Sequence, residues 1–176
     1  MILKVARLGH PVLRRKARPV PIKQIRSAGT QSFIRDMIET MHEYDGVGIA
    51  APQLHASLQI AVIEVQGNPR YPHAPKIPLM VLINPRLRPV LRRKILDWEG
   101  CLSVDGFRGR VPRWQSVEVR AYNAKGRPIH FRAGGFFARV IQHEWDHLQG
   151  KVYLDRMPNL LTLTHLTEYS RYWAKG

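Results

Sequence analysis

The stretch G-G-F-F-A-R-V-I-Q-H-E-W-D-H-L-Q-G, residues 134–150, predicts a helix around which the rest of this chain folds. The helix is expected to run from about Phe136 to Gln149, because two glycines precede it and Gly150 ends it. Its second half contains the pattern His-Glu-x-x-His, which begins at His143 and ends at His147. Residues four positions apart lie roughly 40° apart around a helix axis, so the two imidazoles face one point.

Two imidazoles that face one point are typical of a metal site, and Glu144 lies beside them, where it can take a proton from a bound water. Two ligands do not hold a metal ion, so the chain must supply a third. Glu168 follows His147 by 21 residues, close to the spacing of the third ligand in thermolysin-like metalloproteases. Cys101 is the other candidate, because a thiolate is a strong ligand for borderline metals and the adjacent Gly100 permits unusual backbone geometry. The residue types alone leave both candidates open.

Shorter periodic segments predict a single α+β domain at residues 1–158, followed by a helical tail at residues 159–176. We expect mixed or antiparallel strands to pack around the central helix, and we interpret the proline-rich stretch Gln66–Pro78 as a loop or insertion. The expected strands are Ile60–Val65, Leu79–Ile83, Val117–Tyr122 and Ile129–Arg132, the last two joined by a turn at Lys125-Gly126. The other expected helices are Ser32–Tyr44, with Thr30 or Ser32 as its N-cap, and Asn159–Trp173.

The composition is that of a folded globular protein, with 44% hydrophobic and 23% charged residues in a chain of 176. A single cysteine excludes a framework of disulfides within the chain. No apolar run approaches the ~18–20 residues that span a bilayer, so we expect no membrane partner.

The net charge of +15 is the unusual property of this composition. Nine Lys or Arg and no acidic residue lie between Met1 and Arg35, and five more basic residues lie between Arg86 and Lys94. Such a surface attracts polyanions at low salt. It does not indicate sequence-specific nucleic-acid recognition, because the chain contains no zinc-finger, homeodomain or RNA-recognition motif.

Three segments of this chain together resemble the signature motifs of the peptide deformylase family. They are G-V-G-I-A-A-P-Q at Gly46–Gln53, E-G-C-L-S at Glu99–Ser103 and Q-H-E-W-D-H at Gln142–His147. Each motif alone is modestly specific, but the three occur in the order that the family has and at plausible separations. The resemblance extends from about Ile2 to Met157.

This resemblance implies that Cys101, His143 and His147 bind one divalent metal ion, with a water in the fourth position. Iron(II) is the expected metal, and zinc, nickel and cobalt are the alternatives that such a site also accepts. The family pattern thereby favours Cys101 over Glu168 as the third ligand.

The resemblance also implies which residues carry the chemistry. Glu144 would accept the proton of the water as general base and then deliver it to the leaving amine as general acid. The side-chain amide of Gln53 and the backbone N–H of Leu102 would stabilise the oxyanion that develops on the substrate.

The substrate cleft is implied by further matches to the family. Val47 and Gly48 would line the cleft, where backbone groups pair with an extended peptide as a β-strand would. An apolar pocket would accept a methionine side chain, and Glu99 and Arg108 match family positions near the cleft.

The activity implied by the resemblance is the hydrolytic removal of the N-formyl group from the initiator methionine of nascent polypeptides. N-formylmethionyl peptides are then the substrates, and we hypothesise that the basic surface holds the enzyme near nascent chains at the ribosome. We expect a cytoplasmic location, as in bacterial members. An organellar origin is the alternative, because Asp105–Arg108 resembles the branch that includes organellar enzymes.

Two other functions remain open from the residues. One is a His-Glu-x-x-His zinc metalloprotease that uses Glu168 as its third ligand, and the other is a basic RNA-binding protein with a vestigial metal site. Asp146 and Arg113 carry opposite charges, so they form either a pair behind the site or two separate surface charges.

Overall fold

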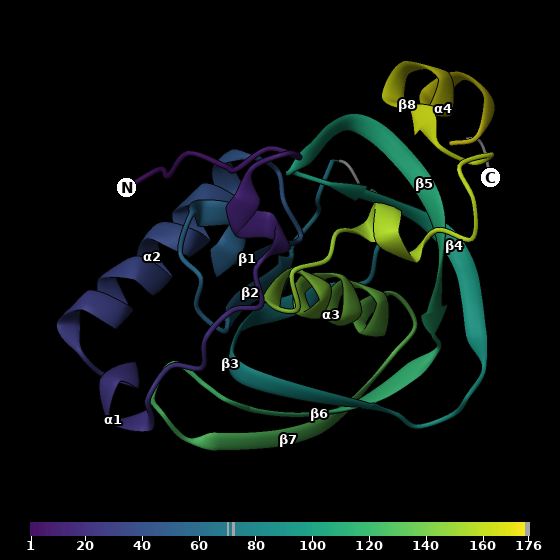
Figure 1. The fold of residues 1–176 in the computed structure, drawn as a ribbon. Coiled ribbons are helices and arrows are strands. Elements are labelled where there is room, and N and C mark those ends of the chain that lie inside the picture. The colour runs from purple at the N-terminus through teal and green to yellow at the C-terminus, as the bar shows by residue number, and fades with distance from the viewer. Residues whose placement is uncertain (70, 72, 175–176) are drawn as a thin grey trace.

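Helix α3 (Gly135–Leu148) lies at the centre of the molecule, between two antiparallel sheets (Figure 1). The structure is a computed structural model that describes residues 1–69, 71 and 73–174. Within these residues the chain forms four α-helices and eight strands, which make up one α+β domain. Because α3 contacts strands of both sheets, the expected central helix is confirmed.

The larger sheet has the strand order β1-β2-β3-β6-β7 and the smaller sheet has the order β4-β5-β8. Each pair of neighbouring strands is antiparallel. The larger sheet consists of β1 (Gly48–Ala50), β2 (Ile60–Val65), β3 (Ile77–Pro89), β6 (Ser116–Tyr122) and β7 (Pro128–Gly134). The smaller sheet consists of β4 (Lys94–Cys101), β5 (Val104–Trp114) and β8 (Thr164–His165).

Strand β2 shows why both faces of the larger sheet are covered. Alternate residues of a strand point to opposite faces. Ile60 and Val62 pack in one core cluster with residues of α2 (Ala28–Glu43), whereas Ile63 and Val65 pack in a second cluster with residues of α3. The continuous apolar run of β2 is therefore the pattern of a strand that is buried on both sides.

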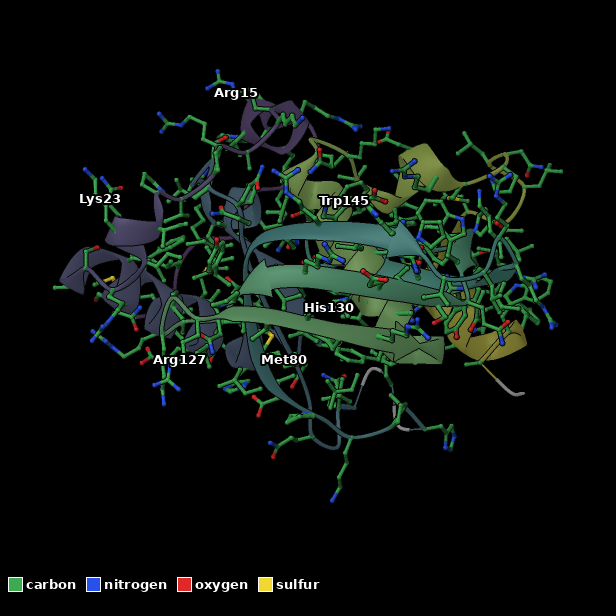
Figure 2. All side chains as sticks on the ribbon, turned by 90° about the horizontal axis from the view of Figure 1, so that it is seen from below. Arg15, Lys23, Met80, Arg127, His130 and Trp145 are labelled. Atoms are coloured by element: carbon green, nitrogen blue, oxygen red, sulfur yellow. The ribbon has the colours of Figure 1, made fainter. Side chains whose placement is uncertain are left out.

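The expected hairpin is confirmed as β6 and β7, which pair along their whole lengths. On β6, Val117 and Val119 face the core, while Glu118 points outward and pairs with His130 of β7 at 3.0 Å. Figure 2 shows this outer side of the two strands, where His130 is exposed. Alternation of apolar and charged residues therefore predicted both the hairpin and its buried face.

Helix α2 begins earlier than the apolar spacing predicts. The expected helix began at Ser32 with Thr30 or Ser32 as its N-cap, but Ser27 is the cap, and its Oγ accepts a hydrogen bond from the Thr30 N–H at 3.3 Å. The first turn contains Ala28, Gly29 and Thr30. Because none of them has a large apolar side chain, the apolar periodicity that predicts a helix does not extend to this turn.

Two strands also differ from the expectation. β3 begins at Ile77 and continues to Pro89, whereas Leu79–Ile83 was expected, so the end of the proline-rich stretch is already strand. The strand β4, which ends at Cys101, was not among the expected strands. The charged residues of β4 interrupt the apolar alternation by which strands are recognised.

The expected helix at Asn159–Trp173 is wrong in its first half. The helix α4 covers only Leu166–Tyr172, and Thr164–His165 forms β8 on the edge of β5. The Asn159 side chain accepts a hydrogen bond from the Leu161 N–H at 3.0 Å, a local bond that competes with helix formation. Leu161 is exposed, so the apolar residues of this segment do not all belong to the buried face of a helix.

The N-terminal segment runs along the molecule before the short helix α1 (Ile22–Ile25) and packs against the end of α3. The Ala17 N–H donates to the Leu148 carbonyl oxygen at 2.9 Å, and Gly150 lies against the backbone of Arg14. Short 3-10 helices occupy Pro11–Arg14, Ala51–Leu54 and Tyr153–Arg156. Among the described residues, no helix combines the length and the apolar character needed to cross a membrane.

We predict that Gly150→Ala lowers the free energy of unfolding by about 2 kcal/mol or more. Gly150 has a φ of +74°, and an added Cβ would lie 2.7 Å from the Arg14 carbonyl oxygen. Urea denaturation of the two proteins measures the difference.

Gly29→Ala is the matched control for this substitution. Gly29 lies in α2, is exposed, and has no atom within 4 Å of an added Cβ. Alanine should stabilise the helix there by about 0.5–1 kcal/mol. An unchanged stability of Gly150→Ala would contradict the close packing of the N-terminal segment on α3.

Candidate active site

Three potential metal ligands converge from two elements that are distant in the sequence. Cys101 ends β4, and His143 and His147 lie one turn apart on α3. Their ligand atoms all lie within 4.8 Å of one another, and the Cys101 Sγ is 3.3 Å from Nε2 of His147. Cys101 and His147 are buried and His143 is partly buried, and Cys101 and His143 line a cavity.

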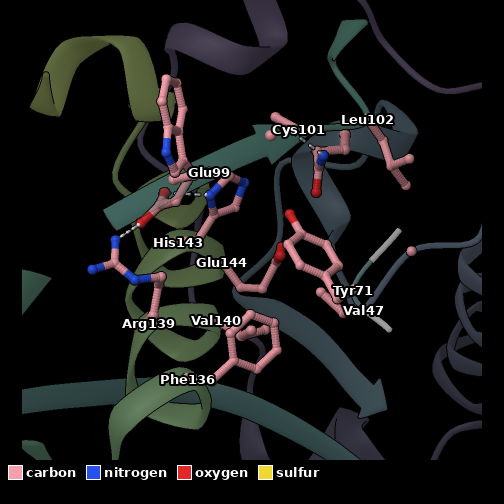
Figure 3. A pocket seen from close by; sticks show the side chains of 15 residues that line it. Val47, Tyr71, Glu99, Cys101, Leu102, Phe136, Arg139, Val140, His143 and Glu144 are labelled. Atoms are coloured by element: carbon pink, nitrogen blue, oxygen red, sulfur yellow. Dashed lines mark hydrogen bonds and ion pairs between the residues drawn. The ribbon is translucent and has the colours of Figure 1, made fainter. Parts of the chain in front are cut away.

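The carboxylate of Glu99 lies behind the imidazole of His143. Its Oε2 is 2.9 Å from His143 Nδ1, and both carboxylate oxygens accept hydrogen bonds from Arg113, at 2.8 and 2.9 Å. Arg139 donates to Glu99 at 2.8 Å (Figure 3). Because Glu99 engages Nδ1, the ring of His143 is oriented with Nε2 available on its other side.

A second buried carboxylate, that of Asp146, completes this network. Arg113 Nη1 donates to Asp146 at 2.5 Å, which confirms that the two charges form a pair behind the site. Arg156 binds the same carboxylate with two nitrogens, the shorter bond being 2.6 Å. Burial alone would lower the pKa of Arg113, but the charges of Glu99 and Asp146 outweigh burial and hold its pKa above the ordinary value. Paired charges therefore link β4, β5 and α3 behind the site and fix their relative positions.

The titratable groups of the site are shifted in opposite directions. Burial would raise the pKa of the Cys101 thiol, but the imidazoles of His147 and His143 outweigh burial and hold its pKa well below the ordinary value. Burial raises the pKa of Glu144 to about 7, and the two imidazoles offset only part of that effect. Such a combination favours a thiolate beside a carboxylate that can exchange a proton near neutral pH.

The position of Glu144 explains the glycine at residue 48. A Cβ added to Gly48 would lie 2.6 Å from Glu144 Oε1, so only glycine lets β1 approach this carboxylate. Glu144 Oε2 is buried and forms no hydrogen bond within the described part of the chain. A buried carboxylate oxygen without a partner faces a position that a water or substrate can occupy.

The side-chain amide of Gln53 is fixed at the edge of the site. Its Oε1 accepts a hydrogen bond from the Ala50 N–H at 2.8 Å, which directs its Nε2 toward Ser103 Oγ at 3.2 Å and Cys101 Sγ at 3.6 Å. Leu102, the other expected oxyanion donor, lies in the turn between β4 and β5, and Arg7 donates to its carbonyl oxygen at 2.8 Å.

The N-terminal segment holds both sides of this edge. The Ala6 N–H donates to the Gln53 carbonyl oxygen at 2.7 Å, and the Leu8 N–H donates to the Ser103 carbonyl oxygen at 2.8 Å. The N-terminal segment therefore forms backbone hydrogen bonds to both segments that carry the oxyanion donors proposed from the sequence, Gln53 and Leu102.

A cavity of about 40 Å³ opens over these groups. Val47, Gly48 and Glu99, which the sequence placed near the substrate, line this cavity together with Gln53 and Leu102. Figure 3 shows the side chains of Val47, Cys101 and Glu144 around the same space. Arg108 does not line this cavity; it lines two neighbouring ones.

Several residues that line the cavity were not predicted from the sequence. They are Tyr71, Trp98, Phe136, Arg139 and Val140. Tyr71 belongs to the proline-rich stretch interpreted as a loop, and only its tertiary position brings it to the cavity. Trp98 precedes Glu99 directly, and Phe136, Arg139 and Val140 precede His143 by seven, four and three residues on the predicted helix, so proximity to the second motif and helical spacing were the available signals.

Glu168, the alternative third ligand, lies away from the group of ligands. It is on α4, is partly exposed, and pairs with Arg171 at 3.3 Å. Among the described residues, the metal-binding group comprises Cys101, His143 and His147 and does not include Glu168.

Comparisons with known proteins agree with the arrangement of these residues. The model of the polypeptide deformylase family matches residues 2–162. Peptide deformylase 2 of Pseudomonas syringae pv. tomato is 43% identical over 157 residues, which cover 89% of this chain and 88% of that protein. Peptide deformylase 2 of Nostoc sp. is 42% identical over 176 residues, which cover 99% of this chain and 97% of that protein.

Solved structures are similar to this chain over nearly the same length. The class I type b peptide deformylase from Acinetobacter baumannii, solved with Met-Ala-Ser bound, has a TM-score of 0.86 and 37% sequence identity, and the match covers 89% of this chain and 99% of that chain. The peptide deformylase from Thermotoga maritima has a TM-score of 0.79 and 32% identity, covering 90% of this chain and 99% of that chain.

We predict that Arg113→Leu lowers the free energy of unfolding by about 3 kcal/mol. The substitution removes the cation shared by Glu99 and Asp146, which stay buried with fewer partners. Arg120→Leu is the control, because Arg120 pairs with Glu118 on the surface and should lose less than about 1 kcal/mol. Equal losses in urea denaturation would show that the buried network does not stabilise the fold.

Proposed function

This chain belongs to the polypeptide deformylase family, and from that premise we propose how its residues carry out the family's reaction. The activity is the metal-dependent hydrolytic removal of the formyl group from the N-terminus of nascent peptides. The convergence of Cys101, His143 and His147 beside Glu144 is the observation that carries the assignment of residues.

The three ligands that we propose fit a divalent transition metal. A thiolate of lowered pKa and two imidazoles are donors that such ions accept. Glu99 orients His143 from behind, as carboxylates that contact the other ring nitrogen of a metal-binding histidine commonly do. We propose iron(II) as the native ion; zinc, nickel and cobalt suit the same donors. When bound, the ion lowers the pKa of a water molecule and so supplies a nucleophile near neutral pH.

Glu144 is the proposed proton carrier. Its buried carboxylate takes a proton from the water that attacks the formyl carbon and then gives a proton to the amine nitrogen as the C–N bond breaks, which releases formate and a free N-terminus. The burial of Glu144 supports this role, because its Oε2 has no hydrogen-bond partner among the described residues and is available to the water and the amine.

Gln53 and Leu102 are the proposed donors to the oxyanion of the intermediate. The amide of Gln53 is held by Ala50, and the turn at Leu102 is held by Arg7, so neither donor needs to reorganise when negative charge develops. Substrate backbone would pair with β1, an edge strand of its sheet, beside Val47 and Gly48.

We also propose the setting in which the enzyme works. Its substrates are N-formylmethionyl peptides, and the location that fits them is the bacterial cytoplasm, since the relatives compared above are bacterial. Basic side chains such as Arg15, Lys23 and Arg127 extend outward from the molecule (Figure 2), and they support an electrostatic attraction to ribosomal RNA.

We predict that Cys101→Ala abolishes metal binding and turnover of a formyl-Met peptide, because two imidazoles alone do not hold the ion. Glu144→Gln should retain the metal and lower kcat at least about a hundredfold, since the ligands remain and the proton carrier is lost. Metal analysis of protein purified without oxygen, paired with a formate-release assay, measures both quantities.

Glu168→Ala is the control for the metal site and should leave metal content and turnover unchanged. Loss of metal in Glu168→Ala, with retention in Cys101→Ala, would instead support a metalloprotease. A chain that holds metal but turns over no formyl-Met peptide would contradict the proposed function.

Association with ribosomes should weaken at least about tenfold when salt rises from roughly 50 to 200 mM, because released counterions drive such binding. Co-sedimentation with ribosomes measures it. Glu144→Gln should sediment like the unaltered protein, since binding does not require the chemistry. Binding that does not change with salt would contradict the electrostatic attraction.

A further inference from the structure

We propose that α4 forms the outer wall of a binding subsite for a large apolar or aromatic side chain of the substrate, located downstream of the formylated methionine. This inference rests on the proposed function and adds a determinant of specificity to it. Two observations support it: a large, mainly apolar cavity that adjoins the catalytic one, and a defined attachment of α4 at its border.

A cavity of about 580 Å³ lies beside the catalytic cavity. Tyr71, Trp98 and Phe136 line both cavities, so the two cavities adjoin, and two of the shared side chains, Tyr71 and Phe136, are in contact with ring centroids 5.3 Å apart. On the far side this second cavity is bounded by residues of α4, among them Tyr169 and Ser170. Its volume falls within the range of about 300–1,000 Å³ that is usual for ligand pockets.

Aromatic contacts attach α4 to the smaller sheet. The ring of Trp98 on β4 lies 5.0 Å from that of Tyr169 and 5.6 Å from that of Trp173. The guanidinium of Arg108 on β5 lies between two rings, 4.7 Å from Tyr71 and 4.8 Å from Tyr169. These contacts place Tyr169 at the junction between α4, the cleft and the strand β5.

The attachment is not explained by a need to complete the core. None of the seven residues of α4 is buried, and a helix of this length is not stable by itself. The match to the family model ends at residue 162, so α4 lies beyond the part of the chain that the model describes, while the match to the Nostoc relative covers nearly the whole chain. α4 is therefore a short exposed helix that bounds the second cavity from beyond the region of the family model.

The walls of the second cavity are mainly aromatic and aliphatic. Leu166 and Tyr169 of α4 line it together with Trp98 and Phe136, and Asp97 and Arg108 are the acidic and the basic residue of the lining. Such a lining suits an apolar or aromatic side chain rather than a charged one.

An extended peptide in the catalytic cavity provides the occupant. It rises about 3.3 Å per residue, so the three residues after methionine extend about 10 Å beyond the reacting group. The second cavity, which α4 bounds, adjoins the catalytic cavity. We infer that one of these three side chains enters the second cavity.

The test uses the metal-loaded, full-length protein and four peptides. They are formyl-Met-Ala-Ala-Ala and the three peptides in which one alanine is replaced by phenylalanine. Phenylalanine at one position should raise kcat/KM about tenfold, the gain expected for filling an apolar pocket. The gain should lie in KM, because a subsite remote from the reacting bond binds substrate and transition state alike.

Two variants remove the subsite in opposite ways. Tyr169→Ala opens its wall and Ser170→Phe fills its space, and each should abolish the tenfold preference for the phenylalanine peptide. Tyr169→Phe keeps the ring and should keep the preference. Tyr172→Ala is the matched control on the same helix, because Tyr172 is exposed and does not line the cavity.

Distinct results would overturn the proposal. Equal kcat/KM for all four peptides in the unaltered protein would show that no downstream side chain is bound. An equal loss for every peptide in Tyr169→Ala and Ser170→Phe would show that α4 only supports the fold. Absence of turnover for all four peptides would overturn the proposed function itself.

Discussion

The buried ion network around Arg113 is the interaction on which the rest of this structure depends. Arg113 on β5 pairs with Glu99 on β4 and with Asp146 on α3, so one guanidinium joins three elements. Each carboxylate also has another cation or imidazole partner, and Glu99 thereby orients His143. A buried charge is tolerated only when its partners are in place, so these contacts select one arrangement of helix and strands. The metal ligands follow from that arrangement.

Close backbone approach is the second constraint at the site. Gly48 lets β1 contact Glu144, and the N-terminal segment binds the backbone beside Gln53 and Leu102 through Ala6 and Arg7. The proposed proton carrier and oxyanion donors are thus held by rigid neighbours before substrate arrives. Preorganised donors of this kind are more effective than donors that must move during the reaction. The high content of small residues in the first motif reflects this packing requirement.

The periphery of the cleft is built differently from its centre. Paired charges and glycine contacts hold the catalytic groups, whereas an edge-to-face contact of Trp98 and a cation–π contact of Arg108 with Tyr169 hold α4. Such aromatic contacts are individually weaker than the pairs of a buried ion network. A chain can therefore change the outer wall of its cleft without disturbing the chemistry, which fits an element that lies beyond residue 162.

The sequence by itself determined the central helix, the facing pair His143 and His147, and the hairpin of β6 and β7. These are local features, because the spacing of apolar residues within a short segment indicates whether it forms a helix or a strand. The approach of Cys101 to that pair was not local; the residues left it open against Glu168, and resemblance to a family favoured it. Only the tertiary structure decided the role of Glu99 behind His143, the place of Tyr71 in the cleft, and the short α4. Contacts between distant segments leave no periodic signal, so the folded chain alone specifies them.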